Sequence, residues 1–530
     1  MKSPASEAMR RFGLVRARDW MLRNGLMHTD ANHVKRGAHF FVWAIVVGCL
    51  AGWTLFNALG NASLADWDEA TYAQLAHEMV QTGDWITPHW NGVPLHDKPP
   101  LVLWCMALGM RLGITSEVAA RLPSAFAGLA VLGLTIMLGR SMFCWWTAVA
   151  AAALLLIRSS YHGGNFVVLA RQGMLDVPLT AFALWALLLF WSGLTRPGAW
   201  VWMGVPCGLA FMTKGLQVVP LVAALIVSAL LVHATDRTLG RDHVRSFAMA
   251  VTIAMAIAVP WHLLEAHLHG REFVDGYFLV HLRKVAHIEA GDRGNWKFYP
   301  SALAGNIPRA WLVVAGTVCI AIWQAIVARD KRAIVLVTWI VIPFTVYSIA
   351  ATKLPWYVVP LQPAAALLVA SLFRRVIPRR SISETVAIAI LLVLVMTWNH
   401  WIPTPIDFDA DIRSLGRCID RMAPPRATVA YYDPLGQYTW ARPSLNIRPS
   451  VRFYANRPMF SFSNRAQLVP WISQGGRDIW ADQSMPDVRA TPLAGFVAVA
   501  QAGPQQYVRY MNRGERIFEP RPDCNPNPNR

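Results

Sequence analysis

The polar stretch around which this chain is organised begins Asp66-Trp-Asp68-Glu69-Ala-Thr-Tyr72 and ends His96-Asp97-Lys98-Pro-Pro100. It lies between two long apolar runs. Unpaired charges beside a membrane segment are costly, so charged residues in such a place need solvent, partners or a function. The stretch is either a solvated loop or a reaction site at the boundary between water and lipid. We expect a reaction site there.

The composition is that of a polytopic membrane protein. Of the 530 residues, 55% are hydrophobic and 15% are charged, and the mean hydropathy is +0.34. A soluble protein would carry about 25% charged residues. Much of the net charge of +18 lies in short loops between apolar runs, as is typical of cytoplasmic loops. The sequence has no glycine-rich phosphate loop, and nucleic-acid binding is not indicated.

Apolar runs of near-spanning length predict about eleven transmembrane helices. Residues 1–37 are a basic leader that we expect in the cytoplasm. The catalytic membrane domain is then 38–402, and its first extracytoplasmic loop is 61–117. With this orientation the basic loops face the cytoplasm and the acidic loops face the opposite side. The predicted spans lie near 38–60, 118–139, 142–157, 176–193, 199–213, 217–233, 246–262, 305–327, 333–349, 355–372 and 382–398, with 100–113 as an interfacial helix.

Residues 403–530 are more polar and predict a small soluble α/β domain on the extracytoplasmic side, with a disordered end. A disulfide between Cys418 and Cys524 is possible if this domain lies in an oxidising compartment. Short strands are expected at Thr428–Tyr432, Val451–Tyr454, Phe496–Ala500 and Tyr507–Met511.

Asp68 and Glu69 are the first catalytic candidates. We expect Asp66 to cap a helix that starts at Trp67 or Asp68, with an apolar stripe that includes Leu75 and Met79. The two carboxylates would then lie at the positive end of the helix dipole, which stabilises their charged form. Capping acids on a surface loop would look the same.

Further candidates face the same side of the membrane. Asp176 precedes Pro178 and is expected to be a helix N-cap; with Asp68 it could hold a divalent metal ion or a phosphate–metal pair. Lys98 is held by the two prolines that follow it, and it could bind phosphate or extend towards the interface. Lys353 and Tyr357 add a cation and a phenol.

The segment from His262 to Pro300 contains His262, Glu265, His267 and His269. This order is not that of a zinc protease helix, and His267 and His269 do not share a helical face. We expect an interfacial loop helix rather than a catalytic zinc site. The basic residues that follow would suit an anionic lipid headgroup, although aromatic residues are common at interfaces anyway; these are Arg283, Lys284, Arg293 and Lys297, interleaved with Trp296, Phe298 and Tyr299.

Several motifs occur together and in order: Asp68-Glu69-Ala-Thr-Tyr72, Asn91-Gly-Val-Pro, Asp97-Lys98-Pro-Pro-Leu, Ala120-Arg121-Leu-Pro-Ser, Leu175-Asp176-Val-Pro and Lys353-Leu-Pro-Trp-Tyr357. The set resembles the bacterial 4-amino-4-deoxy-L-arabinose:lipid A transferases, relatives of the protein O-mannosyltransferases with the GT-C fold. The likeness covers roughly residues 38–370.

The resemblance implies an undecaprenyl-phosphate-linked sugar donor, lipid A or another envelope acceptor, and a periplasmic site in the bacterial inner membrane. It implies that Asp68 is the key catalytic carboxylate, supported by Glu69 and Asp176. Lys98 and Lys353 would hold the donor phosphate, with Tyr357 nearby. From its place in the basic segment described above, we expect Arg283 to bind this phosphate as well.

Two residues depart from the family pattern: Thr71 replaces an arginine, and Asp97 replaces a glutamate. These changes leave the identity of the sugar open.

Three other functions remain open from the sequence. A protein O-mannosyltransferase-like enzyme would use a hydroxyl acceptor. A secondary transporter would place its polar site near the midplane, within related halves, but the candidate residues cluster at one face and no repeat is visible. An accessory protein with a degenerate site would tolerate Asp68→Asn.

Overall fold

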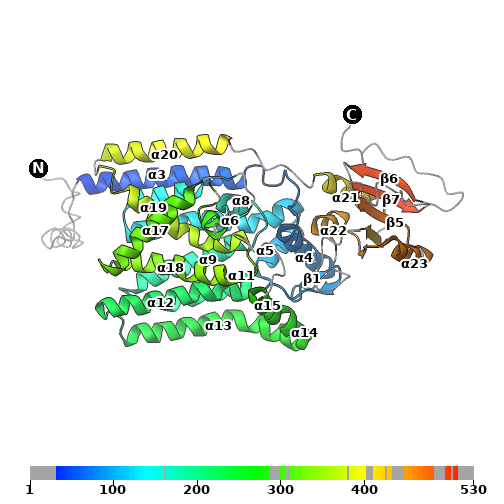
Figure 1. Ribbon diagram of the computed structural model, residues 1–530, viewed down its shortest axis with the longest axis horizontal. Coiled ribbons are helices and arrows are strands. Elements are labelled where there is room, and N and C mark those ends of the chain that lie inside the picture. Colours follow the sequence, from blue (N-terminus) through cyan, green and yellow to red (C-terminus); the bar gives the residue numbers. More distant parts are fainter. Residues whose placement is uncertain are drawn as a thin grey trace, which may run out of the picture.

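The computed structural model describes residues 31–159, 163–286, 298–305, 307, 309–378, 381–401, 410–423, 427–432, 447–474, 476–482, 496–502 and 505–510. Long apolar helices lie side by side in a bundle, and a small β-sheet lies beyond one end of it (Figure 1). Shorter helices, among them α4, α5 and α15, lie between the bundle and the sheet or at that end of the bundle.

The bundle is a multi-pass membrane assembly. Within the described residues, seven helical segments are long and apolar enough to cross a membrane, and four shorter apolar helices accompany them. Within the described residues, each expected apolar run overlaps a helix, although several helices begin or end a few residues inside the expected bounds. The bundle helices are α3 (Ala31–Phe56), α6 (Ser116–Met142), α7 (Trp145–Leu155), α9 (Asp176–Gly193), α10 (Ala199–Trp202), α11 (Gly204–Lys214), α12 (Val219–Asp236), α13 (Arg241–His269), α17 (Ala310–Ile326), α18 (Lys331–Ile349), α19 (Gln362–Phe373) and α20 (Ser381–Trp401).

Gly215 divides the apolar segment 199–236 into the two arms expected from the sequence. Its φ of +58° is rarely adopted by other residues, and a Cβ there would lie 2.2 Å from the Tyr277 hydroxyl. Before it, Lys214 is bonded to Asp176 at the start of α9. After it, α12 ends at Asp236, which pairs with Lys331 at the start of α18. Helix α11 therefore runs towards the end of the bundle where α9 begins, and α12 runs back from that end.

The end of the bundle near the sheet carries most of the candidate residues. Helix α4 packs on α5 through a buried apolar stripe that includes the expected Leu75, Ala76 and Met79. The elements of this layer are α4 (Asp68–Thr82), β1 (His89–Trp90), β2 (Val93–Pro94), α5 (Leu101–Arg111), α8 (Phe166–Ala170), α14 (Arg271–Val274), η2 (Asp275–Leu279), α15 (Val280–Ala286), α16 (Phe298–Leu303) and η3 (Pro355–Leu361).

Helix α13 is longer than expected. It continues past His262 to His269 and ends at Gly270, whose φ is +52°. The predicted loop helix begins only afterwards, as α14, η2 and α15. Of the basic and aromatic residues expected there, Arg293, Trp296 and Lys297 lie outside the described residues.

The C-terminal part is a mixed α/β unit, as expected. Its sheet has the order β4-β3-β5-β7-β6, in which β3 runs parallel to β4 and β5, and β7 runs antiparallel to β5 and β6. Its elements are α21 (Ala410–Met422), β3 (Val429–Tyr432), α22 (Pro449–Ala455), β4 (Met459–Phe462), η5 (Arg465–Gln467), α23 (Leu468–Ser473), β5 (Asp478–Asp482), β6 (Phe496–Ala502) and β7 (Gln505–Tyr510).

One predicted strand is wrong. Val451–Tyr454 lies in helix α22, which begins with Pro449 at a position where proline favours helix initiation. Its apolar side packs against Cys418 and Ile419 of α21 within one buried cluster. Cys418 is buried and disulfide-bonded, whereas Cys524 lies outside the described residues.

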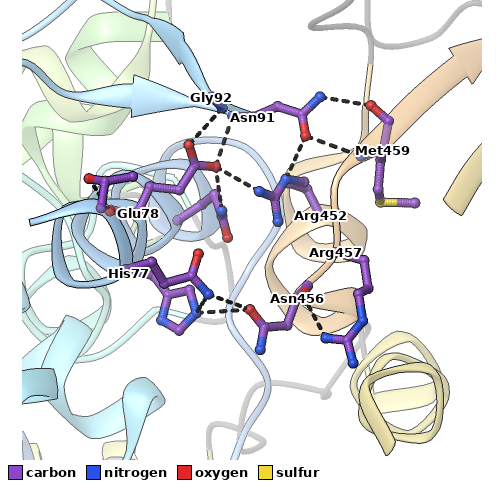
Figure 2. Close-up of polar contacts among 11 residues, drawn as sticks. His77, Glu78, Asn91, Gly92, Arg452, Asn456, Arg457 and Met459 are labelled. Carbon is purple, nitrogen blue, oxygen red and sulfur yellow. Dashed lines mark hydrogen bonds and ion pairs between the residues drawn. The ribbon is translucent and has the colours of Figure 1, made fainter. Parts of the chain in front are cut away.

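Helix α4 and the β1–β2 turn are fastened to the C-terminal unit through Glu78 (Figure 2). Its Oε1 accepts hydrogen bonds from the Asn91 backbone N–H at 2.8 Å and from the Arg452 guanidinium at 2.9 Å. Its Oε2 accepts one from Gly92 N–H at 2.9 Å. The Asn91 side chain in turn donates to the Met459 carbonyl at 2.7 Å. The position of α4 therefore depends on the C-terminal unit.

We expect acid to weaken this contact through His77. Its Nε2 lies 3.1 Å from Asn456 Oδ1, and burial lowers the pKa of His77. The folded state therefore favours the neutral ring, and stability falls as the pH drops below the unfolded value of about 6.5. Arg452, Glu78 and Asp420 are the charged groups that face it. Thermal unfolding at pH 5 and pH 7 should show the loss.

The matched variant is His77→Gln, which does not titrate in this range. It should flatten the pH dependence. An equally steep dependence in this variant would contradict the assignment to His77.

Candidate active site

Helix α4 begins at Asp68, but Asp66 does not cap it, so that prediction is wrong. The Asp66 carboxylate instead binds the C-terminal unit. It accepts hydrogen bonds from Arg448 Nε at 2.7 Å and from Ser450 N–H at 3.1 Å. Trp67 precedes the helix with φ +69°, a strained conformation for a bulky residue. Asp68 is half-buried in the first turn, at the positive end of the helix dipole.

Glu69 is a fully engaged, buried carboxylate. Arg121 Nε donates to its Oε1 at 2.7 Å, and the same oxygen accepts Gly173 N–H at 2.8 Å. Its Oε2 accepts Ala65 N–H at 2.6 Å. Arg121 also donates to three carbonyl groups of the segment before α4. Glu69 therefore fixes the start of α4 to α6 and to the turn before α9.

Breaking this pair should strongly destabilise the protein. Arg121→Met would leave the Glu69 carboxylate charged and buried, at a cost of about 3–5 kcal/mol. The free energy of unfolding of the purified variant measures this. The control is Arg245→Met, because Arg245 and Asp242 form an exposed ion pair that contributes little. Equal stability of the two variants would contradict the anchoring role.

Asp176 is the first residue of α9, and Leu175 is the N-cap. The prediction that Asp176 caps the helix is therefore wrong by one position. Its Oδ1 accepts a hydrogen bond from Lys214 Nζ at 2.5 Å, with both side chains at most 2% exposed. Its Oδ2 is buried and makes no hydrogen bond. Lys214 was not a candidate, although a lysine in an apolar run is a signal of function.

Lys98 is buried beside Asp97 and His281. Its Nζ lies 3.0 Å from Asp97 Oδ2 and 3.4 Å from His281 Nε2, and the residue is 8% exposed. His281 belongs to α15, and its Nδ1 lies 2.6 Å from the Tyr277 carbonyl oxygen. Sequence reasoning did not select His281, because nothing local indicates its contact with Lys98.

Tyr72 marks the point where these elements meet. Burial raises the pKa of the Tyr72 phenol well above its ordinary value, and the nearby charges of Asp68, Asp97 and Asp176 raise it further, in that order. Tyr357 is close to the same three carboxylates, and Lys214 Nζ lies 5.4 Å from the centre of its ring. Asp68 and Lys98 are also electrostatic neighbours of Asp176.

The structure therefore brings Asp68, Lys98, Asp176 and Tyr357 together at one end of the bundle. These residues come from α4, the loop before α5, α9 and η3.

Lys353 and Arg283 lie at the margin of this group. Lys353 Nζ donates to the Ala350 carbonyl at 2.7 Å. Ala351 N–H donates to the Val285 carbonyl of α15 at 3.0 Å. Helix α15 thus contacts the Lys353 loop, and through His281 it also contacts Lys98. Arg283 is an exposed residue of this helix.

A divalent metal ion held by Asp68 and Asp176 is not favoured by this arrangement. The Lys214 ammonium already neutralises Asp176 through Oδ1, and it would repel a second cation. In the described part of the chain, no third histidine, cysteine, aspartate or glutamate completes a ligand set with these two.

Part of this chain resembles known proteins in sequence. Residues 97–263 match the family described as dolichyl-phosphate-mannose-protein mannosyltransferase. The undecaprenyl phosphate-alpha-4-amino-4-deoxy-L-arabinose arabinosyl transferase 2 of Pseudomonas fluorescens is 32% identical over 348 residues, which are 63% of this chain and 57% of that protein. The arabinosyl transferase of Pseudomonas savastanoi pv. phaseolicola is 31% identical over 57% of this chain and 56% of its own length. The chain is thus similar to aminoarabinose transferases over part of its length.

Solved structures support the fold. ArnT from Cupriavidus metallidurans, solved bound to undecaprenyl phosphate, superposes with a TM-score of 0.70 at 21% identity and covers 88% of this chain and 98% of its own. The archaeal oligosaccharyltransferase AglB from Archaeoglobus fulgidus gives a TM-score of 0.52 at 11% identity, covering 84% of this chain and 70% of its own. The matches to the curated arabinosyl transferases span a little over half of their length.

Proposed function

We propose that this chain is a membrane glycosyltransferase that moves a sugar from an undecaprenyl-phosphate-linked donor to lipid A or another envelope acceptor. The observation that carries the proposal is the convergence of Asp68, Asp176 and Lys98 at one end of a GT-C bundle. The relatives named as aminoarabinose transferases support an aminoarabinose-like sugar.

The chemistry requires a stabilised leaving phosphate. Fixed cations supply this stabilisation when they are preorganised in a site of restricted solvent access. Lys98 is buried beside Asp97 and His281, and we assign it the phosphate of the donor, with Lys353, Tyr357 and Arg283 on the same side. The polyprenyl chain would then extend along the apolar helices.

We assign Asp68 to the acceptor. A phosphate acceptor is already ionised and needs only to be held in line with the anomeric carbon, so Asp68 would orient it. A hydroxyl acceptor needs a base, and Asp68 could take its proton. The Lys214 ammonium pairs with Asp176, and Asp68 is an electrostatic neighbour of that carboxyl group. Tyr72 remains protonated, because its pKa is raised, and it can donate a hydrogen bond.

The proposed location is the bacterial inner membrane, with the N-terminus in the cytoplasm and the C-terminal unit in the periplasm. Support comes from the distribution of charge. Helix α3 begins at the end of the bundle away from the C-terminal sheet (Figure 1). The loops expected in the cytoplasm contain Arg140, Arg196, Arg237 and Arg329.

A protein O-mannosyltransferase-like activity is the second candidate. It is favoured by the match of residues 97–263 to the mannosyltransferase family. It differs from the first in its acceptor, a serine or threonine hydroxyl, and the lipid A experiment that closes the Discussion separates the two.

Binding of undecaprenyl phosphate tests the donor site directly. We expect Lys98→Met to weaken binding about 10- to 100-fold, because a charge-assisted hydrogen bond contributes about 1.5–3 kcal/mol. Native mass spectrometry of the purified protein measures it. The control is Lys331→Met, since Lys331 pairs with Asp236 at the other end of the bundle. Binding by Lys98→Met as tight as by the control would contradict the assignment.

A further inference from the structure

Three side chains outside the proposed active site form a compact donor group. His96 lies in the first loop, and Glu265 and His269 lie on α13. Their ligand atoms all lie within 4.8 Å of one another. His96 Nδ1 is 3.1 Å from Glu265 Oε2, and His269 Nε2 is 3.9 Å from the same oxygen. Glu265 and His269 are i and i+4, so they share one face of the helix.

The group is buried and its hydrogen bonding is incomplete. The side chains of His96 and Glu265 are 3% and 0% exposed. Neither ring nitrogen of His96 makes a hydrogen bond, and neither does Glu265 Oε2. The approach of His96 Nδ1 to that oxygen therefore lacks hydrogen-bond geometry. Buried polar atoms are rarely left in this state, and a bound ion is one of the standard explanations.

We propose that His96, Glu265 and His269 bind a divalent zinc ion. Two imidazole nitrogens and one carboxylate oxygen are typical zinc ligands, with bonds of about 2.0–2.2 Å. Tetrahedral bonds of this length separate ligand atoms by about 3.3–3.6 Å. The distances of 3.1 Å and 3.9 Å bracket that range. Water would occupy the fourth position.

Thr87 completes the surroundings. Its hydroxyl donates to Glu265 Oε1 at 2.8 Å and lies 2.9 Å from His269 Nε2. A hydrogen bond to the other oxygen of a ligating carboxylate orients it and is a regular feature of metal sites. The Phe273 ring packs edge-on against His96, with centroids 5.5 Å apart. The ligand set is thus held from three segments of the chain.

The ion would join the first loop to the end of α13. His96 is two residues before Lys98, so the metal would also limit the movement of Lys98. This second effect rests on the proposed function, whereas metal binding itself does not. His267, two residues from both Glu265 and His269 on α13, is exposed on another face of the helix and is not part of the set.

Metal content of the purified full-length protein tests the site. After removal of metal with a chelator and addition of Zn²⁺, elemental mass spectrometry should find about one ion per chain in the wild type and in His267→Ala. His96→Ala and His269→Ala should retain almost none. Unfolding temperature should rise on Zn²⁺ addition only in the first two proteins.

X-ray absorption of the zinc-loaded wild type does not depend on any variant folding. It should show nitrogen and oxygen ligands at about 2.0–2.2 Å that include imidazole. No bound zinc in the wild type would overturn the proposal, and so would equal zinc in His269→Ala or a sulfur ligand. Loss of sugar transfer with unchanged zinc would concern the proposed function alone.

Discussion

Asp68→Asn is expected to reduce sugar transfer about 100- to 10,000-fold, the range measured for loss of a positioned acid–base group. Asn keeps the shape of the side chain and removes its charge, so it cannot accept a proton, and it forms weaker hydrogen bonds to the acceptor. The initial rate of transfer, measured by mass spectrometry in membranes supplied with donor lipid, gives the effect.

The control for this variant is Asp242→Asn. Asp242 is exposed at the start of α13, so the same substitution there removes a charge far from the site. Asp68→Asn should also keep the unfolding temperature of the wild type, because Asp68 is only half-buried. Full activity of Asp68→Asn would remove Asp68 from the reaction and would favour an accessory role for the chain.

Lys214→Met is expected to destabilise the protein by about 3–5 kcal/mol and to abolish transfer. The substitution leaves the Asp176 carboxylate buried without its counter-ion, and an uncompensated buried charge has a cost of this order. The free energy of unfolding and the transfer rate should both be measured.

The double variant Asp176→Val/Lys214→Met separates stability from catalysis. Replacing a buried ion pair by apolar residues is often neutral or stabilising, so the double variant should regain much of the stability. It should remain inactive, since Asp176 is then absent from the site. Restored activity would make Asp176 a structural residue, and an unchanged Lys214→Met would contradict the burial argument.

The bundle and the placement of the site were predictable from general properties of the sequence. Apolar runs mark the spans by their length, and basic loops mark one side. These two patterns alone place Asp68, Asp176 and Lys353 on the same side. The structure agrees that Asp68 and Asp176 lie near each other. Their roles in catalysis remain predictions.

The partners of these residues could not be predicted, because they depend on tertiary contacts between distant segments. Lys214 is 38 residues from Asp176, and Arg448 is 382 residues from Asp66. Asp66 is a residue type that often caps helices, and it lies just before α4. Its carboxylate instead accepts a hydrogen bond from the Arg448 guanidinium. The local sequence allows several hydrogen-bond partners for a polar side chain, and tertiary packing determines which one it contacts.

The wrong strand prediction and the missed His96 contact both reflect tertiary packing. Val451–Tyr454 alternates like a strand, but it folds as a helix that buries itself between α4 and α21. Glu265 and His269 were considered with His267, whereas the residue whose ligand atom lies within 4.8 Å of both of theirs is His96 of the first loop. The i, i+4 spacing of Glu265 and His269 predicts that they share one face of a helix. Nothing in the local sequence predicts that His96 lies next to them.

The most direct test of the account is mass spectrometry of lipid A from cells with the gene deleted and complemented. We predict that deletion removes one sugar-sized mass from lipid A, that the wild-type chain restores it, and that Asp68→Asn does not. An unchanged lipid A profile after deletion would contradict lipid A as the acceptor and would direct the search to glycoproteins and other envelope glycans.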